Sequence, residues 1–269
     1  MFRTKNPRAL TIAGSDSGGG AGIQADLKTF AALGVYGASV ITALTAQNTR
    51  DVRGIHGAPP EFVRLQLDTV LSDIAIGAVK TGMLLNAAIV ETVAEGLRAH
   101  RVRRVVLDPV MVSKHGRRLL EAGAVTAVRE LLAPMATVIT PNAMEAALLA
   151  RMRRVETLDD MKRAAGKILQ LGSQSVLIKG GHAGSRSRAV DFWTDGHAEL
   201  ELDAPRLRAI HTHGTGCALS AALAAHLAMG HPLMEAVYAA KHFITGAIRH
   251  GYRVGAGVSP VDHLWMTRA

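Results

Sequence analysis

The sequence predicts an α/β protein built on a doubly wound, mostly parallel central sheet with helices on both faces. Short apolar segments alternate along the 269 residues with longer segments of helical periodicity. Several of the short segments are apolar throughout, which is typical of parallel strands buried on both faces. Polar residues follow the ends of these segments, where a doubly wound sheet forms its binding crevice.

The expected strands are the short apolar segments, at 9–13, 38–44, 76–79, 102–107, 137–140 and 176–178. Two further segments, 190–193 and 198–202, flank Asp195-Gly196 and predict a small β-hairpin. No stretch has the composition of a linker, so we expect a single domain over residues 1–269.

The expected helices fill the gaps between strands, at 23–33, 61–74, 87–100, 122–132, 143–150 and 158–171. Asn86, Asn142 and Thr157 each stand just before one of these helices. Their side chains can accept a hydrogen bond from a free N–H of the first turn, so we expect them to be N-caps. Two longer helices, at 217–229 and 232–250, close the chain.

Composition narrows the class of protein. No run approaches 18 uncharged apolar residues, and residues 1–10 lack the apolar core of a signal peptide, so we expect no membrane contact. A single cysteine excludes an internal disulfide framework and fits a cytoplasmic location. The net charge of +9 comes from dispersed arginines, and only 4% of residues are aromatic. We therefore expect phosphorylated small ligands rather than nucleic acid as partners.

The pentapeptide His213-Gly214-Thr215-Gly216-Cys217 carries the clearest chemical signal. A Gly-rich turn that opens a helix presents free backbone N–H groups and the positive end of the helix dipole to an anion. Cys217 falls in the first turn, where the pKa of a thiol tends to drop below about 8.5, so it could be a thiolate base for phosphoryl transfer. A Gly-rich turn with a small buried cysteine explains the same residues equally well.

A second Gly-rich segment, residues 14–22, follows the first strand and has five glycines in nine residues. These glycines let the backbone approach a ligand closely, which favours a binding loop over a merely flexible turn. The segment lacks the Gly-Lys-Ser/Thr ending of a Walker A loop, and it fits the Rossmann spacing poorly.

Carboxylates and a lysine follow three later strands. Asp108 comes after the strand at 102–107, and Asn142 and Glu145 come after the strand at 137–140. Asp108 and Glu145 could hold Mg²⁺ through water. Alternatively, Asp108 is a turn residue, and Asn142 and Glu145 form a capping box. Lys179 ends the strand at 176–178 before two glycines, which suits a phosphate contact.

Two other groups of residues gave weaker signals. Lys241 lies in the middle of the last helix among small and apolar residues, where its amine could simply extend to water. The histidines at 182, 211, 213 and 242 do not share the spacing of metal ligands, so we expect no zinc site.

Taken together, the motifs resemble the bacterial hydroxymethylpyrimidine/phosphomethylpyrimidine kinases of thiamine biosynthesis, which belong to the ribokinase-like superfamily. The resemblance spans about residues 9–260 and includes Cys217, where most superfamily members carry Asp. Ala218 departs from the Thr found in many members. The motifs follow the family's order, at 14–26, 42–49, 80–84, 108–111, 140–145, 179–182 and 213–217.

The resemblance implies a function and a set of site residues. The activity would be ATP-dependent phosphorylation of 4-amino-5-hydroxymethyl-2-methylpyrimidine and then of its monophosphate. The pyrimidine would bind Gly14, Ala21, Asp26, Gln47, Met83 and Val110. ATP would bind Asn142, Lys179, Thr212, Gly214, Gly216 and Lys241, with Mg²⁺ held through water by Asp108 and Glu145. The catalytic set would be Lys179, Gly214, Thr215, Gly216, Cys217 and Lys241.

Two alternative functions stay open. The nearest is a pyridoxal or pyridoxine kinase, or one enzyme that serves both kinds of substrate. The other is a pyrimidine sensor that keeps the pocket without turnover. Superfamily analogy further implies a homodimer.

Overall fold

The fold was taken from a computed structural model that describes residues 6–111, 120–121, 123–181, 188–207 and 211–268. One nine-stranded sheet runs through it in the order β3-β2-β1-β4-β5-β6-β7-β8-β9. The strands are β1 (Arg8–Asp16), β2 (Tyr36–Gln47), β3 (Val52–Gly57), β4 (Ala78–Thr81), β5 (Val105–Leu107), β6 (Val138–Ile139), β7 (Val176–Ile178), β8 (Arg188–Thr194) and β9 (Glu199–Pro205).

The strands from β2 to β7 in this order pair in parallel, and β3, β8 and β9 add antiparallel pairings at the two edges. The sequence-based prediction of an α/β fold with a mostly parallel sheet is therefore confirmed. The hairpin expected around Asp195-Gly196 is formed by β8 and β9, with Thr194 paired to Glu199.

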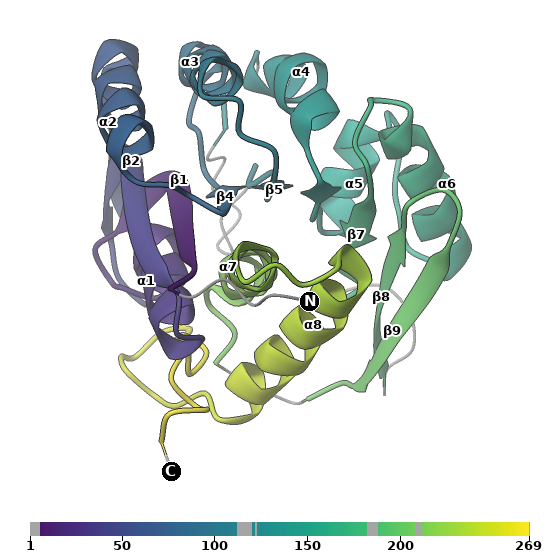
Figure 1. The fold of residues 1–269 in the computed structure, drawn as a ribbon. Coiled ribbons are helices and arrows are strands. Elements are labelled where there is room, and N and C mark those ends of the chain that lie inside the picture. The colour runs from purple at the N-terminus through teal and green to yellow at the C-terminus, as the bar shows by residue number, and fades with distance from the viewer. Residues whose placement is uncertain (1–5, 112–119, 122, 182–187, 208–210, 269) are drawn as a thin grey trace.

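Helices cover both faces of the sheet (Figure 1). On one face lie α2 (Pro60–Asp73), α3 (Ala87–Ala99), α4 (Ala124–Ala127), α5 (Ala143–Leu149) and α6 (Leu158–Leu169). On the other lie α1 (Gly22–Ala32), α7 (Thr215–Ala228) and α8 (Leu233–Arg249). Each layer buries its own apolar cluster against the sheet, represented by Leu67 and Ile89 on the first face and by Phe30 and Phe243 on the second.

The expected N-caps are confirmed. The Asn86 side chain accepts a hydrogen bond from the Ile89 N–H at 3.0 Å. Asn142 and Thr157 each form a reciprocal capping box, with Glu145 and Asp160 as their partners. Each cap satisfies a backbone donor that the helix itself leaves free.

Two elements differ from the sequence-based expectation. The strand β3 was not predicted, because it contains Arg53 and two glycines, and its extended form comes from antiparallel pairing along β2. The helix expected at 122–132 is a short α4 that continues as a π-helical turn over Val128–Leu132, followed by a 3₁₀ turn at Pro134.

Helix α7 positions the site. It is buried on nearly all sides, with small residues such as Ala221, Ala224 and Ala225 against the sheet and its neighbours. Its N-terminus begins after Gly214, whose φ of 76° is a left-handed conformation that favours glycine. This start lies at the carboxyl ends of the parallel strands, beside the loop that follows β1. No helix in the described residues is long and apolar enough to span a membrane.

Candidate active site

The loop after β1 is organised by one carboxylate. Asp16 accepts hydrogen bonds from the backbone N–H groups of Gly18, Gly20 and Ala21 at 2.8, 3.1 and 2.8 Å. Burial opposes the charge on Asp16, but a hydrogen bond from His213 and these N–H groups keep the pKa of the carboxyl below its usual value. The Gly-rich loop is therefore an ordered turn around a carboxylate rather than a loose linker.

The pentapeptide packs directly onto this loop. A Cβ at Gly214 would lie 1.8 Å from the carbonyl oxygen of Gly20, so only glycine fits there. A Cβ at Gly216 would lie 3.2 Å from the Lys179 amine, which brings that lysine to the first turn of α7. The N-cap residue of this helix is Gly214, and within the described part of the chain it supplies no side-chain cap. An uncapped helix N-terminus beside a lysine is suited to an anion.

Cys217 does not have the lowered pKa that its position in the helix predicted. Burial raises the pKa of the thiol to about 11, and the carboxylates of Asp26 and Asp108 add to the rise. Lys80 and the backbone N–H of Gly22 oppose it without overcoming it. The prediction was wrong because desolvation and two nearby negative charges outweigh the helix dipole. In the free protein the side chain is a neutral thiol at pH 7.

Lys179, Asp108 and Glu145 form a buried charge cluster at the ends of β5, β6 and β7. The Lys179 amine lies 2.9 Å from Asp108 Oδ1 and 4.0 Å from Glu145 Oε2. Burial would raise the pKa of Asp108, but Lys179 and Lys80 hold it below its usual value. Burial raises the pKa of Glu145 to about 7, and Lys179 offsets only part of that rise. The cluster therefore holds one firmly ionised carboxylate and one that titrates near neutral pH.

The oxygens of this cluster fit a hydrated Mg²⁺ better than a directly bound one. Both Glu145 oxygens accept backbone N–H groups, from Asn142 at 2.8 Å and Met111 at 3.4 Å. The second Asp108 oxygen accepts the Ser220 hydroxyl at 3.0 Å. In the described residues, no group of three or more His, Cys, Asp or Glu side chains could hold a metal ion. Carboxylate oxygens suit Mg²⁺, and partners already on them favour contact through water.

A second buried ion pair lies beside Cys217. The Lys80 amine is 2.8 Å from Asp26 Oδ2, and both side chains are fully buried. Burial opposes the charge on Lys80, but Asp26, Cys217 and Asp108 raise the pKa of its amine above the usual value. Asp26 Oδ1 is buried and has no hydrogen-bond partner among the residues that the structure describes. An unmatched buried carboxylate oxygen is costly, which suits a ligand donor at this point.

Lys80 was missed by reasoning from the sequence. It stands inside β4 between Val79 and Thr81, which are both buried, and a lysine is rarely fully buried unless it is paired. A lysine inside a buried strand therefore predicts a buried carboxylate partner, but the sequence does not identify that carboxylate. Ser220 was missed as well, since nothing in the sequence relates it to Asp108.

Three other residues expected in the pyrimidine pocket, Gly14, Ala21 and Met83, lie at the loop after β1. A Cβ at Gly14 would lie 2.4 Å from the Met83 methyl group, so these two residues are in contact. Ala21 precedes α1 and donates its N–H to Asp16. Val110 follows Asp108 and is half-buried.

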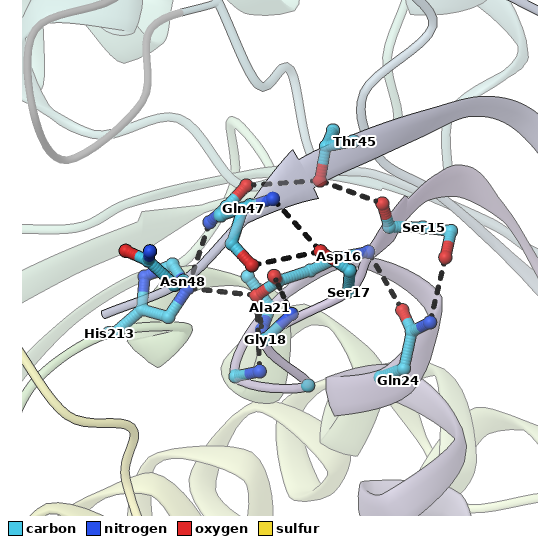
Figure 2. A network of polar contacts seen from close by, with 12 residues as sticks. Ser15, Asp16, Ser17, Gly18, Ala21, Gln24, Thr45, Gln47, Asn48 and His213 are labelled. Carbon is cyan, nitrogen blue, oxygen red and sulfur yellow. Dashed lines mark hydrogen bonds and ion pairs between the residues drawn. The ribbon is translucent and has the colours of Figure 1, made fainter. Parts of the chain in front are cut away.

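Gln47 ends β2, and its side chain points toward His213 of the pentapeptide (Figure 2). The network in Figure 2 joins the loop after β1, the end of β2 and the start of α7. These segments are far apart in the sequence. The structure therefore brings Gln47 to the same site as Cys217 and the Gly-rich loop.

The remaining expected ATP contacts are more widely spread. The Lys241 amine does not extend to water but lies 2.8 Å from Asp191 Oδ2, and the other oxygen of Asp191 accepts the Gly180 N–H. The Asn142 side chain caps α5. The Thr212 carbonyl accepts the Thr215 hydroxyl at 2.8 Å. His182 lies outside the described residues.

This fold and site define a small-molecule kinase: an uncapped helix N-terminus, a lysine and two buried carboxylates meet at the carboxyl edge of a doubly wound sheet. The family model for phosphomethylpyrimidine kinase matches residues 16–262. The chain belongs to this family of ATP-dependent kinases.

Individual relatives agree with the family. The chain is 54% identical to the hydroxymethylpyrimidine/phosphomethylpyrimidine kinase of Streptomyces coelicolor, over 96% of this chain and 95% of the relative. It is 51% identical to the thiamine biosynthesis bifunctional protein of Geobacter sulfurreducens, over 95% of this chain and 52% of that longer protein. Among solved structures, an ADP complex of Bacillus subtilis pyridoxal kinase aligns with a TM-score of 0.92 at 42% identity, covering 98% of this chain and 100% of the other.

Proposed function

We propose that this kinase phosphorylates 4-amino-5-hydroxymethyl-2-methylpyrimidine and then its monophosphate with ATP, which yields the diphosphate used in thiamine diphosphate biosynthesis. The observation that carries the proposal is the meeting of Lys179 and Gly216 at the uncapped start of α7, beside Cys217. The names of the relatives in Streptomyces coelicolor and Geobacter sulfurreducens support the choice of substrate.

In this proposal the pyrimidine lies against Gly14, Ala21, Met83 and Val110, with its polar edge toward Gln47. The Gln47 amide can match an amino donor and a ring-nitrogen acceptor at once. The free Oδ1 of Asp26 supports a ligand donor on the same side, because no group of the described protein satisfies it. Together these contacts orient the hydroxymethyl group toward the start of α7.

The proposed ATP contacts are Asn142, Lys179, Thr212, Gly214, Gly216 and Lys241. The N–H groups of Gly214, Thr215 and Gly216 would stabilise charge on the transferred phosphoryl group. Lys179 would act on the same charge as a fixed cation, because Asp108 and Glu145 raise the pKa of its amine above the usual value even though burial opposes it. Lys241 would act through Asp191, which accepts the N–H of Gly180 next to Lys179.

Mg²⁺, when bound through water to Asp108 and Glu145, would neutralise charge on the phosphates of ATP. The two residues contribute differently. Asp108 is ionised in the free protein, whereas Glu145 exchanges a proton near pH 7. A cation nearby favours the ionised form of Glu145.

Cys217 is the proposed acceptor of the alcohol proton in the first phosphorylation. Its thiol is neutral in the free protein, with a pKa of about 11. Lys80 is the group that favours the thiolate, since its ammonium acts on the sulfur. A neutral thiol cannot accept a proton, so the alcohol proton would pass to the thiolate, which must first release its own proton to solvent and which the Lys80 ammonium stabilises.

The alternative substrate is pyridoxal, and the likeness to the pyridoxal kinase of Bacillus subtilis favours it as a second activity. Steady-state assays with ATP and each of three substrates test the choice: the aminopyrimidine alcohol, its monophosphate and pyridoxal. We expect turnover of both pyrimidines with the higher kcat/KM. Turnover of pyridoxal alone would overturn the proposal. Tight pyrimidine binding without turnover of any substrate would favour the sensor.

We also propose that the protein is a cytoplasmic homodimer organised as one ribokinase-like domain. The single sheet through the described residues supports one domain. Light scattering on the purified protein gives the mass in solution. A monomeric mass of about 28 kDa at micromolar concentration would exclude the dimer.

A further inference from the structure

His213 connects two loops through a single ring nitrogen. Its Nε2 lies 2.9 Å from Asp16 Oδ2 and 3.1 Å from Gln47 Nε2. The His213 and Asp16 side chains are 12% and 4% exposed, so water does little to replace these contacts. Figure 2 shows one ring nitrogen of His213 facing both the Asp16 carboxylate and the Gln47 amide, with Thr45 on the far side of the amide.

The contact with Asp16 determines that the His213 Nε2 atom carries a hydrogen. This carboxylate already accepts three backbone N–H groups, so it acts only as an acceptor. An unprotonated Nε2 at 2.9 Å would set two acceptors against each other. The His213 Nε2 therefore carries a hydrogen and donates it to Asp16, whether the ring is neutral or charged.

With Nε2 as a donor, the Gln47 NH₂ group 3.1 Å away sets a second donor against it. Thr45 shows the same conflict on the other side, because its one hydroxyl hydrogen faces both the Ser15 carbonyl at 3.0 Å and Gln47 Oε1 at 3.3 Å. A half-turn of the amide removes the donor–donor contact at His213 and the surplus acceptor at Thr45. The single Nε2–H of His213 is then shared between Asp16 Oδ2 at 2.9 Å and the Gln47 oxygen, in a three-centre hydrogen bond. The Gln47 NH₂ group donates to the Thr45 oxygen, and the Thr45 hydrogen remains on Ser15.

We propose that the His213–Asp16 pair holds the Gln47 amide with its oxygen toward His213, and so sets the order in which the pocket offers a donor and an acceptor to the substrate. The inference rests on the proposed function, in which Gln47 contacts the aminopyrimidine edge. His213 is thus a positioning residue that determines specificity. The amide keeps one N–H and one lone pair free for the ligand, in a fixed order.

A matched pair of ligands tests this order. The aminopyrimidine has an amino donor beside a ring-nitrogen acceptor. Its 4-oxo analogue has nearly the same shape but carries a carbonyl acceptor beside a ring N–H donor. A fixed amide distinguishes the two ligands, and an amide that can turn freely accepts either.

The experiment measures kcat and KM for both ligands with wild type and His213→Phe, which keeps a ring without a donor. We expect the wild-type preference in kcat/KM for the amino ligand to fall about tenfold or more in His213→Phe, mainly through KM. His213→Gln, which retains an N–H donor, should recover much of the preference. His100→Phe is the matched control, because His100 donates to Asp68 at 2.8 Å on the far helical layer.

The outcomes separate the inference from the function on which it rests. Equal losses for both ligands in His213→Phe, with an unchanged preference, would overturn the inference and leave a structural role for the ring. No turnover of the aminopyrimidine by wild type would instead overturn the proposed function. A preference lost in His213→Phe and regained in His213→Gln supports the inference.

Nitrogen NMR on the unliganded wild-type enzyme gives a second readout that does not depend on catalysis. Long-range ¹H–¹⁵N spectra distinguish a protonated from an unprotonated Nε2. We expect the His213 Nε2 to be protonated at pH 7 and to lose its downfield proton signal in Asp16→Ala. An unprotonated Nε2 in the wild type would contradict the inference.

Discussion

At the scale of single residues, the chemistry of this site depends on neighbours more than on residue type. Cys217 occupies a helix position that lowers thiol pKa values in other settings, yet burial, together with Asp26 and Asp108, raises its pKa to about 11. The Lys80 ammonium opposes this rise in the thiol pKa, and its ion pair with Asp26 fixes its position. Removal of a single side chain here therefore changes the charge balance of the whole site.

Replacement of Cys217 should separate the two phosphorylations. Transfer to the alcohol requires loss of a proton, and general-base assistance is commonly about 10²–10⁴-fold. The monophosphate needs no base, because its second pKa is near 6 and it is largely dianionic at pH 7. We expect Cys217→Ala to lower turnover of the alcohol far more than turnover of the monophosphate at saturating ATP. Equal fractional losses would assign Cys217 a purely structural role.

Loss of the Gln47 amide should weaken recognition of the pyrimidine alone. Gln47→Leu leaves polar groups of the buried ligand unmatched, which should weaken pyrimidine binding by about 1–3 kcal/mol. ATP affinity should hardly change. Calorimetry with each ligand measures both effects. Gln66→Leu is a useful control, because Gln66 bonds to the β2 backbone at Ile41 away from the site. Unchanged pyrimidine binding in Gln47→Leu would remove this residue from the pocket.

At the scale of elements, the start of α7 decides whether an anion can be held. The helix is rich in alanine and lies between the sheet and its neighbouring helices, so its axis has little freedom. Its first turn faces the loop after β1 on one side and Lys179 on the other. A small change of volume at Gly216, which faces Lys179, should therefore act on the anion site.

Gly216→Val tests the anion site. The new side chain would begin 3.2 Å from the Lys179 amine and would occupy space beside the first turn of α7. Valine keeps its backbone N–H, but its side chain would displace the phosphoryl group from the donors at this turn. Loss of one such donor interaction typically lowers the rate about 10²–10³-fold, so kcat should fall strongly while pyrimidine binding is retained. Gly166→Val on α6 is the control, because a Cβ there meets no atom within 4 Å. Near-normal turnover in Gly216→Val would refute this placement of the phosphoryl group.

At the scale of the whole molecule, the site concentrates buried charge where the helical layers meet the sheet. Burial raises the pKa of Glu145 from 4.5 to about 7 on folding. A group with a raised folded pKa binds more protons when folded. Its contribution to stability is therefore fully present below about pH 4.5 and is lost as the pH rises through 7.

Glu145→Gln should make that loss visible. The free energy of unfolding of wild type should fall between pH 5 and pH 8, because Glu145 must ionise in a buried position. The neutral amide does not titrate, so the variant should become more stable relative to wild type by on the order of 2 kcal/mol over this range. Urea unfolding of both proteins at the two pH values measures the difference. The exposed Glu156→Gln should show no such trend. A constant difference between wild type and Glu145→Gln across this range would contradict the raised pKa.

Most of the fold could be predicted from the sequence because its signals are local. Apolar runs with strand length and helices with recognisable caps such as Asn142 and Thr157 depend on near neighbours in the chain. β3 could not be predicted, since Arg53 and its glycines form a strand only through pairing with β2. The π-helical turn at Val128–Leu132 likewise has no sequence signal that we recognised.

The sequence by itself determined the family, the polar residues that follow the strands, and the Gly-rich turns. Short motifs suffice for these, because the residue types in them set the local backbone conformation and the available chemistry. Only the tertiary structure decided the ion pair of Lys80 with Asp26, the pairing of Lys241 with Asp191, and the contact of His213 with both Asp16 and Gln47. It also reversed the expected pKa of Cys217. Desolvation and charge act through space, so they depend on groups that the chain brings together only when it folds.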